Sequence, residues 1–299
     1  MPRVLHLLSQ RPSYTGSGVM LEALVDQAAQ AGWEQEVVVG TPADDPQPQV
    51  AGARVHPLVF GTDELPFPLP GMSDVMPYPS SRFSALTSGQ LGSYRTAWRN
   101  HVGTVLAQFG PDVIHSHHVW ILSSIVKDLA PDTPVVTQSH ATGFRQMTLC
   151  PHLADEVRQG CCRNERIAVL TEHHAARAKD VLGLPDDRIV VTGAGYRDDV
   201  FHTRGRRPGT GHILYVGKYS RAKGLPWLLD AFERLGDATL HVAGSGAGAE
   251  ADALRARMEA HPRVVLHAWG RVEGQLLSGT KPIPGAPVWL KGGGDRKHR

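Results

Sequence analysis

The sequence predicts an α/β protein built of two Rossmann-like domains, of which the second is incomplete. Short apolar runs typical of buried strands alternate with segments of helical periodicity along most of the chain. Glycine-rich turns follow several of these runs and open the next helix, as in a parallel sheet with crossover helices. The alternation breaks at the glycine- and arginine-rich segment 203–211 and then restarts, which indicates a second domain.

The first domain is expected over residues 1–200, and its elements follow from the hydrophobic period. In the first helix, Leu21, Leu24 and Val25 recur at spacings of three and four residues, and Gly32 is expected to cap its end. The strands are expected at Val4–Leu8, Val37–Val39, Val55–Phe60, Asp112–His115, Pro134–Thr137, Arg166–Leu170 and Ile189–Thr192. The helices are expected at Val19–Ala31, Tyr94–Phe109, Ile121–Leu129, Leu153–Gly160 and His173–Leu182, and the proline-rich residues 41–93 as long loops.

The second domain is expected over residues 201–273 and is short of strands. Its strands are expected at His212–Gly217, Thr239–Ala243 and Val264–His267, and its helices at Leu225–Leu235 and Glu250–Ala260. A doubly wound sheet usually has five or six strands, so this domain is predicted to be partial. Residues 274–299 are rich in glycine and proline and end in a basic run, which predicts a disordered tail.

Composition excludes several classes of protein. Of the 299 residues, 41% are hydrophobic and 20% charged, and the net charge of +2 is too balanced to indicate nucleic-acid binding. No apolar run reaches the roughly 20 residues of a membrane-spanning helix, so we expect at most peripheral membrane contact. The N-terminal apolar stretch is too short for a signal peptide, and three cysteines cannot all pair with one another. A cytoplasmic protein with reduced thiols is expected.

Histidines gather where two predicted strands end. His115, His117 and His118 close one strand and His140 follows the next, at the sheet edge where open α/β sheets bind ligands. We expect His115 and His117 to share a strand face and His118 to lie opposite. No carboxylate or cysteine beside them completes a metal site, and the spacing of Cys150, Cys161 and Cys162 matches no zinc pattern. Histidines lining a cleft are therefore favoured over a metal site, and no metal is expected.

Glycines also mark the turn after the first strand. Gly16 and Gly18 open the first helix, where glycine lets the backbone approach an oxygen-rich ligand and the helix N-terminus favours negative charge. The third glycine of the dinucleotide fingerprint is missing, which argues against a dehydrogenase. A tight turn without a ligand explains these two glycines equally well.

The segment from Gly217 to Gly224 is the most informative in the chain. It lies between a strand and a helix and holds Lys218, Arg221 and Lys223 between its two glycines. Such a loop can clamp a diphosphate, because glycines admit the oxygens and the cations neutralise charge on a departing phosphate. An exposed basic loop without a ligand is the alternative. Gly244 and Gly246 follow the next strand and would face the same crevice.

Together these segments resemble the GT-B glycosyltransferases of family 4 (glycosyl transferases group 1). The similarity extends over residues 3–272, and the loop with Lys218 and Lys223 is its most specific part. The segments that carry it are 31–39, 111–117, 136–140, 167–171, 193–201, 215–224 and 228–232. Lys218 stands where the family usually has arginine, which keeps the charge but loses the bidentate fork.

The resemblance implies transfer of a sugar, with retention, from a nucleoside diphosphate sugar and without a metal or other cofactor. His140 would contact the transferred sugar, while Lys218 and Lys223 would bind the diphosphate together with Gly217. Gly16 and Gly18 would lie near the donor phosphates and the acceptor, with Gly244 and Gly246 as further donor-loop candidates. His117 and His118 are candidates for the acceptor side. The acceptor could be a saccharide, a lipid or a small molecule.

One feature of the family is missing. Its members carry two glutamates eight positions apart late in the second domain, and this sequence has no glutamate pair at that separation. The segment from Gly274 onward does not resemble the family. We therefore expect a C-terminally truncated transferase that is impaired or inactive alone. A vestigial or non-catalytic nucleotide-sugar-binding protein is the alternative, followed by a sugar-nucleotide epimerase, which would need acid and base carboxylates in its cleft.

Overall fold

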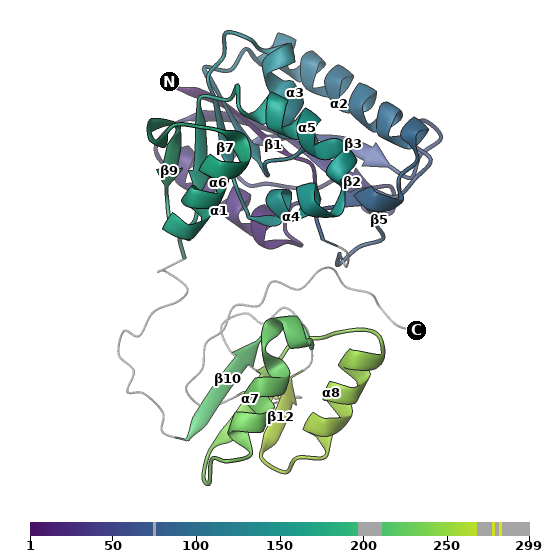
Figure 1. Ribbon diagram of the computed structural model, residues 1–299, viewed down its shortest axis with the longest axis vertical. Coiled ribbons are helices and arrows are strands. Elements are labelled where there is room, and N and C mark those ends of the chain that lie inside the picture. The colour runs from purple at the N-terminus through teal and green to yellow at the C-terminus, as the bar shows by residue number, and fades with distance from the viewer. Residues whose placement is uncertain (74–75, 197–210, 268–276, 279–280, 283–299) are drawn as a thin grey trace. The chain divides into compact units, whose positions relative to one another are not determined.

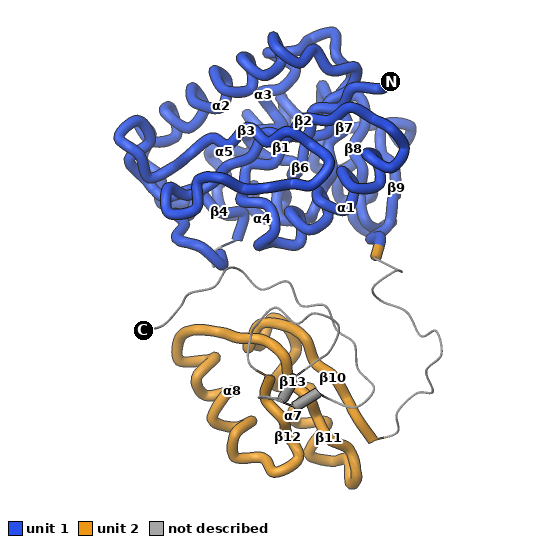
Figure 2. Tube along the Cα trace, turned by 180° about the vertical axis from the view of Figure 1, so that it is seen from behind, with its two compact units in different colours: residues 1–195 blue, residues 196–299 orange. Residues whose placement is uncertain are grey.

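The computed structural model divides into two compact units, Met1–Gly195 (unit 1) and Tyr196–Arg299 (unit 2) (Figure 2). The structure describes residues 1–73, 76–196, 211–267, 277–278 and 281–282. The domain boundary expected at residue 200 lies outside these residues.

Unit 1 is built on a parallel sheet of seven strands in the order β3-β2-β1-β6-β7-β8-β9 (Figure 1). All seven predicted strands are confirmed, with shifts at their ends, and so is the predicted α/β class. The strands are β1 (Arg3–Leu8), β2 (Glu34–Pro42), β3 (Arg54–Phe60), β6 (Val113–His117), β7 (Val135–Gln138), β8 (Arg166–Val169) and β9 (Ile189–Val191). Two short strands, β4 (Pro70–Gly71) and β5 (Ser81–Arg82), pair separately.

The strand order reverses at β1. The chain runs from β1 outward through β2 and β3, and then returns to pair β6 with the other side of β1. Crossover connections on either side of such a switch point diverge, which leaves a crevice beyond the carboxyl ends of the two central strands. In this sheet the crevice is expected beyond the ends of β1 and β6.

Six helices accompany the sheet in the part of unit 1 that the structure describes. They are α1 (Gly16–Gln30), α2 (Ser88–Phe109), α3 (Ile121–Leu129), α4 (Thr142–Leu149), α5 (Pro151–Cys161) and α6 (Glu172–Leu182), with 3₁₀ turns at Phe83–Ala85 and Asp186–Arg188. Helix α1 begins three residues earlier than predicted because Thr15 caps it, and its C-cap is Ala31, with Gly32 following at a φ of +78°. Helix α4 was not predicted.

The two faces of the sheet carry separate cores. Leu5 and Leu7 belong to the larger core, which includes the fully buried Trp98 and Trp120. Leu8 packs with Leu21 and Val25 of α1 in a smaller core. Because successive side chains of a strand point to opposite faces, His6 shares the face of Leu8 and lies on the α1 side.

Helices α3 and α5 approach closely at a glycine, which leads to a stability prediction. A Cβ atom on Gly160 would lie 2.2 Å from the carbonyl oxygen of Ser124. We expect Gly160→Ala to lower the free energy of unfolding by about 2–3 kcal/mol, because the helices must separate. Gly103→Ala in α2 is the control, since nothing lies within 4 Å of its Cβ position and it should stabilise by up to ~1 kcal/mol. Urea unfolding measures the free energy of unfolding of both variants. A change of the same sign in the two variants would contradict the close packing of α3 and α5 as its cause.

Unit 2 contains a three-stranded parallel sheet, β10-β11-β12, with α7 and α8. Its elements are β10 (His212–Val216), a 3₁₀ turn (Arg221–Lys223), α7 (Leu225–Phe232), β11 (Thr239–Ala243), α8 (Ala249–Glu259) and β12 (Val264–His267). Helix α7 ends three residues before the predicted end. Within the tail predicted to be disordered, Leu277–Ser278 (β13) and Lys281–Pro282 (β14) pair antiparallel, and its other residues lie outside those described.

Candidate functional site

Strained backbone conformations occur at the carboxyl-terminal ends of the central strands of unit 1. Ser13, His118 and Ala141 have φ values of 72°, 70° and 62°, and among the described residues they are the only non-glycine ones with positive φ. They follow the carboxyl ends of β1, β6 and β7, which are neighbours in the sheet. Such conformations cost about 1–3 kcal/mol each and persist mainly where function holds them, so they place the candidate site at the switch point.

His140 is held at this edge by the two histidines that end β6. Its Nε2 lies 2.9 Å from Nδ1 of His117, and its ring centroid is 4.7 Å from that of His118. His118 in turn is bonded through Nδ1 to the hydroxyl of Thr142 at 2.9 Å. The prediction that His118 lies opposite His117 is wrong: β6 ends at His117, and the positive φ of His118 turns the backbone so that both rings meet His140.

These rings are neutral at physiological pH. Burial lowers the pKa of His140 to about 4, and burial with the neighbouring histidines holds the pKa of His117 well below its usual value. The pKa of His118 is lowered in the same way. A neutral imidazole has one donor and one acceptor nitrogen. Because Nε2 of His140 is bonded to His117, its Nδ1 is the atom that can donate to or accept from a hydroxyl group.

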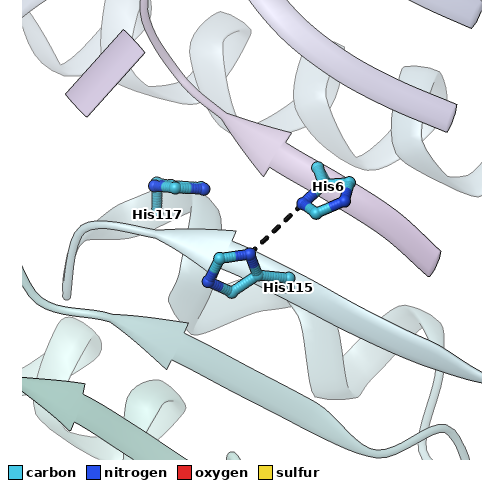
Figure 3. A group of neighbouring side chains, drawn as sticks. All are labelled: His6, His115 and His117. Carbon is cyan, nitrogen blue, oxygen red and sulfur yellow. Dashed lines mark hydrogen bonds between the residues drawn. The ribbon is translucent and has the colours of Figure 1, made fainter. Parts of the chain in front are cut away.

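A further histidine joins the site from β1. His6 lies in register with His115 of β6, and the Nδ1 atoms of the two rings are 3.2 Å apart (Figure 3). Burial lowers the pKa of His6 to about 4 and that of His115 to about 3. One ring nitrogen from each of His6, His115 and His117 lies within 4.8 Å of the other two. His6 was not predicted from the sequence, because only the β1–β6 register brings together residues 109 positions apart.

The two glycines of the turn between β1 and α1 have different structural settings. A Cβ on Gly18 would lie 2.9 Å from Cα of Pro12, and the Gly18 N–H donates to the Thr15 hydroxyl at 3.1 Å. Gly18 is therefore required for packing of the turn and for the helix cap. Gly16 is exposed in the first turn of α1. That either glycine lies near donor phosphates stays a prediction.

Arg11 is a second residue of this edge that the sequence analysis missed. Its side chain is buried, donates from Nε to a carboxylate oxygen of Asp45 at 2.9 Å, and lies over the ring of Tyr14. Because the Asp45 carboxylate neutralises its charge, Arg11 holds the turn after β1 against the segment that follows β2. Its only signal in the sequence is its position directly after the polar residues that follow β1.

In unit 2 the two predicted donor loops lie side by side. The Gly217 N–H donates to the carbonyl of Ala243 at 3.0 Å, and the Tyr219 N–H to that of Ser245 at 3.0 Å. A Cβ on Gly244 would lie 1.9 Å from the oxygen of Gly217, so only glycine allows this approach. The close contact confirms that both loops share the carboxyl edge of the unit 2 sheet.

The cations of these loops face solvent. Lys218 and Lys223 are both exposed, and Lys223 ends the 3₁₀ turn directly before Gly224, the N-cap of α7, which has a φ of +77°. The Arg221 N–H donates to the carboxylate of Glu250 at 2.9 Å, which ties the loop to α8. Gly246 packs against α8, where its Cβ would lie 2.7 Å from that of Ala251. The exposed lysines offer positive charge to an anion, and binding of a diphosphate stays a prediction.

A cleft of about 1010 Å³ lies between β3 and α2 of unit 1, and none of the strand-end histidines described above lines it. Asp63 and Glu64 are part of its lining, so its charge does not suit a phosphate ligand. We therefore place the candidate site at the strained strand ends and not in this cleft.

Residues 15–195 match the glycosyl transferase 4-like domain, which is more than half of the chain. The chain belongs to this family. The family that the sequence analysis recognised is thereby confirmed, and no curated protein matches the chain. None of the described helices of this glycosyl transferase 4-like protein is long and apolar enough to cross a membrane.

Solved structures with the same fold include transferases and an epimerase. A sucrose-phosphate synthase from Thermosynechococcus elongatus has a TM-score of 0.63 at 14% identity, over 89% of this chain and 70% of that one. The lipopolysaccharide outer core galactosyltransferase WaaB in its apo form gives 0.57 at 11% identity, over 90% and 68%. A UDP-GlcNAc 2-epimerase from Neisseria meningitidis, bound to UDP-GlcNAc, gives 0.54 at 12% identity, over 90% and 73%. At such identities the likeness shows the GT-B fold alone.

Proposed function

We propose that this glycosyl transferase 4-like protein transfers a sugar from a nucleoside diphosphate sugar to an acceptor hydroxyl, with retention at the anomeric carbon. The observation that carries the proposal is the neutral His140 at the end of β7, bonded to His117 on a strained edge of the sheet. A neutral imidazole suits recognition of an uncharged sugar hydroxyl, whereas an imidazolium would be matched to an anion.

The unit 2 loops would take the leaving group. As the bond from the anomeric carbon to the diphosphate breaks and the bond to the acceptor oxygen forms, negative charge grows on the diphosphate. Lys218 and Lys223 can neutralise that charge, and Gly244 lets the loop that carries them pack closely against the loop after β11. The charge is supplied by the chain's own cations, so we propose that transfer needs no metal ion at the diphosphate and no other cofactor.

The roles of the two remaining histidines follow from their burial. His117 is 1% exposed and His118 3%, so neither ring offers a surface to an acceptor. We propose that they orient His140 from the acceptor side of the site. A cytoplasmic location is supported by the three cysteines, none of which forms a disulfide.

Calorimetry with uridine and guanosine diphosphates tests this function, followed by mass spectrometry of mixtures with the matching sugar nucleotides. Binding with slow sugar transfer or donor hydrolysis is the expected result, because the missing glutamate pair is expected to impair turnover. Binding with conversion of the sugar nucleotide into its epimer would instead identify an epimerase. Absence of binding to either nucleotide would reject the proposal in favour of a vestigial protein.

His140 gives a direct prediction within this function. We expect His140→Ala to lower kcat/KM about 10-fold, because one hydrogen bond to the sugar, worth roughly 1–1.5 kcal/mol, is lost. His152→Ala is the control, since His152 is exposed in the first turn of α5. Initial rates of the two variants should differ accordingly, and equal rates would remove His140 from the site.

A further inference from the structure

The orientation of His6 is fixed by a buried glutamine. Gln35 donates from Nε2 to the carbonyl of Val25 at 2.9 Å, so its Oε1 must face the Nε2 of His6 at 3.0 Å. An amide oxygen can only accept, and therefore His6 carries its proton on Nε2. Because the ring is neutral, its Nδ1 is a bare lone pair that points at His115.

The spacing of His6 and His115 fits two ligands of one metal ion. Nitrogens bound to a tetrahedral zinc ion at ~2.0–2.1 Å lie about 3.3 Å apart, and the two Nδ1 atoms are 3.2 Å apart. The buried Gln35 oxygen behind His6 is the kind of outer partner that fixes the tautomer of a metal-binding histidine. Without an ion, the same spacing is a hydrogen bond donated by His115.

His117 supplies the second, independent observation. Its Nδ1 is bonded to His140, whereas its buried Nε2 has no hydrogen-bond partner among the described residues. A buried polar nitrogen without a partner costs free energy, and a ligand on that nitrogen removes the cost. Figure 3 shows His117 beyond His115 at the end of β6, on the side of the sheet where His6 lies.

The geometry points to a site for one divalent transition-metal ion, of the zinc class, bound by His6, His115 and His117. Three imidazoles suit zinc, cobalt, nickel or copper and not magnesium or calcium, which take oxygen ligands. Burial keeps all three rings neutral, the form that binds metal.

Such an ion would bridge the two central strands beneath the candidate site and so link it to His140. With Nε2 of His117 on the metal, Nδ1 must carry the proton and donate to Nε2 of His140. His140 would then keep its own proton on Nδ1, which sets the donor that it offers to a ligand. The role proposed is structural and orienting, and it does not depend on the transferase function proposed above.

Metal titration of the purified full chain tests the site. After treatment with a chelator, we expect one Zn²⁺ per chain by calorimetry, tetrahedral absorption bands with Co²⁺, and no response to Mg²⁺. His115→Gln should weaken zinc binding by more than about 100-fold, and Gln35→Leu by roughly 10- to 100-fold, because it releases His6. His241→Gln in unit 2 is the matched control: it disturbs another row of bonded histidines, His212, His241 and His267, and should leave zinc binding unchanged.

A measurement on the unmodified chain keeps the proposal open to rejection even if a variant fails to fold. Zinc-edge X-ray absorption should show at least three nitrogen ligands at about 2.0 Å and no sulfur. A sulfur ligand at about 2.3 Å would place the ion on the cysteines and overturn the proposal. It would equally be overturned by a chain that binds no zinc at micromolar concentrations, by unchanged binding in His115→Gln, or by loss of binding in His241→Gln.

Discussion

Acidification from pH 7 to pH 5 will strongly destabilise unit 1 of the metal-free protein, because its central histidines are neutral in the folded state. The pKa of His6 falls from 6.5 to about 4 through burial, against the partial opposition of its bond to Gln35. In the unfolded chain the same ring takes up a proton near pH 6.5. Between about pH 6.5 and pH 4 the unfolded state therefore binds more protons than the native state, and acid shifts the equilibrium toward unfolding.

The size of the effect follows from the same shift. His6 contributes its full stabilisation above pH 6.5 and loses it progressively below, about 2 kcal/mol by pH 5 at ~1.4 kcal/mol per pH unit. His115, with a pKa near 3, and His140, with a pKa near 4, act in the same direction. A loss of several kcal/mol is comparable to the whole stability of an ordinary domain, so we expect unit 1 to unfold in mild acid.

Urea titrations with a chelator present, followed by tryptophan fluorescence at pH 7, 6 and 5, measure this dependence. His115→Gln should make the free energy of unfolding less dependent on pH, since one titrating ring is removed. His152→Gln should retain the full slope, because His152 is exposed and lies outside the cluster. A free energy of unfolding that stays constant from pH 7 to pH 5 would contradict the burial of neutral rings.

Much of the fold could be predicted because strands and helices are indicated by patterns of neighbouring residues in the sequence. Each of the strands β1, β2, β3 and β6–β9 contains a short apolar run, and burial of the central strands on both faces of a parallel sheet favours such runs. Helix α4 was missed because it has only eight residues. The chain enters it through Ala141 in a left-handed conformation, which an alanine in the sequence does not predict. Helix α1 was placed late because its first turn is Gly-Ser-Gly, and Thr15 determines its start.

The candidate site could be predicted only where its residues are close in sequence. His117 ends β6 and His140 follows β7, the next strand along the chain, and parallel pairing brings these two strand ends together by topology alone. The contact of His6 with His115 depends on register, and that of His118 with His140 on a strained backbone. Neither quantity can be read from composition or period, so both contacts required the structure.

Loss of the positive charge at Lys223 will lower transfer more than loss of His140. Lys223 lies at the end of the 3₁₀ turn that leads into α7, on the loop packed against Gly244. If it stabilises the departing diphosphate, Lys223→Ala removes a charge that matters most in the transition state. We expect kcat/KM to fall about 100-fold, mainly through kcat, and the Kd of the nucleoside diphosphate to rise about 10-fold.

Arg234→Ala provides the matched control, because Arg234 is an exposed cation of the same unit at the other end of α7. It changes the net charge of unit 2 equally, so a general electrostatic effect would lower donor binding in both variants, whereas a site effect would appear only at Lys223. Lys223→Arg should restore most of the nucleotide affinity if charge is what the loop supplies. Equal nucleotide affinity in Lys223→Ala and the unmodified chain would mean that the loop is an exposed basic turn, and donor binding would have to be sought elsewhere in the protein.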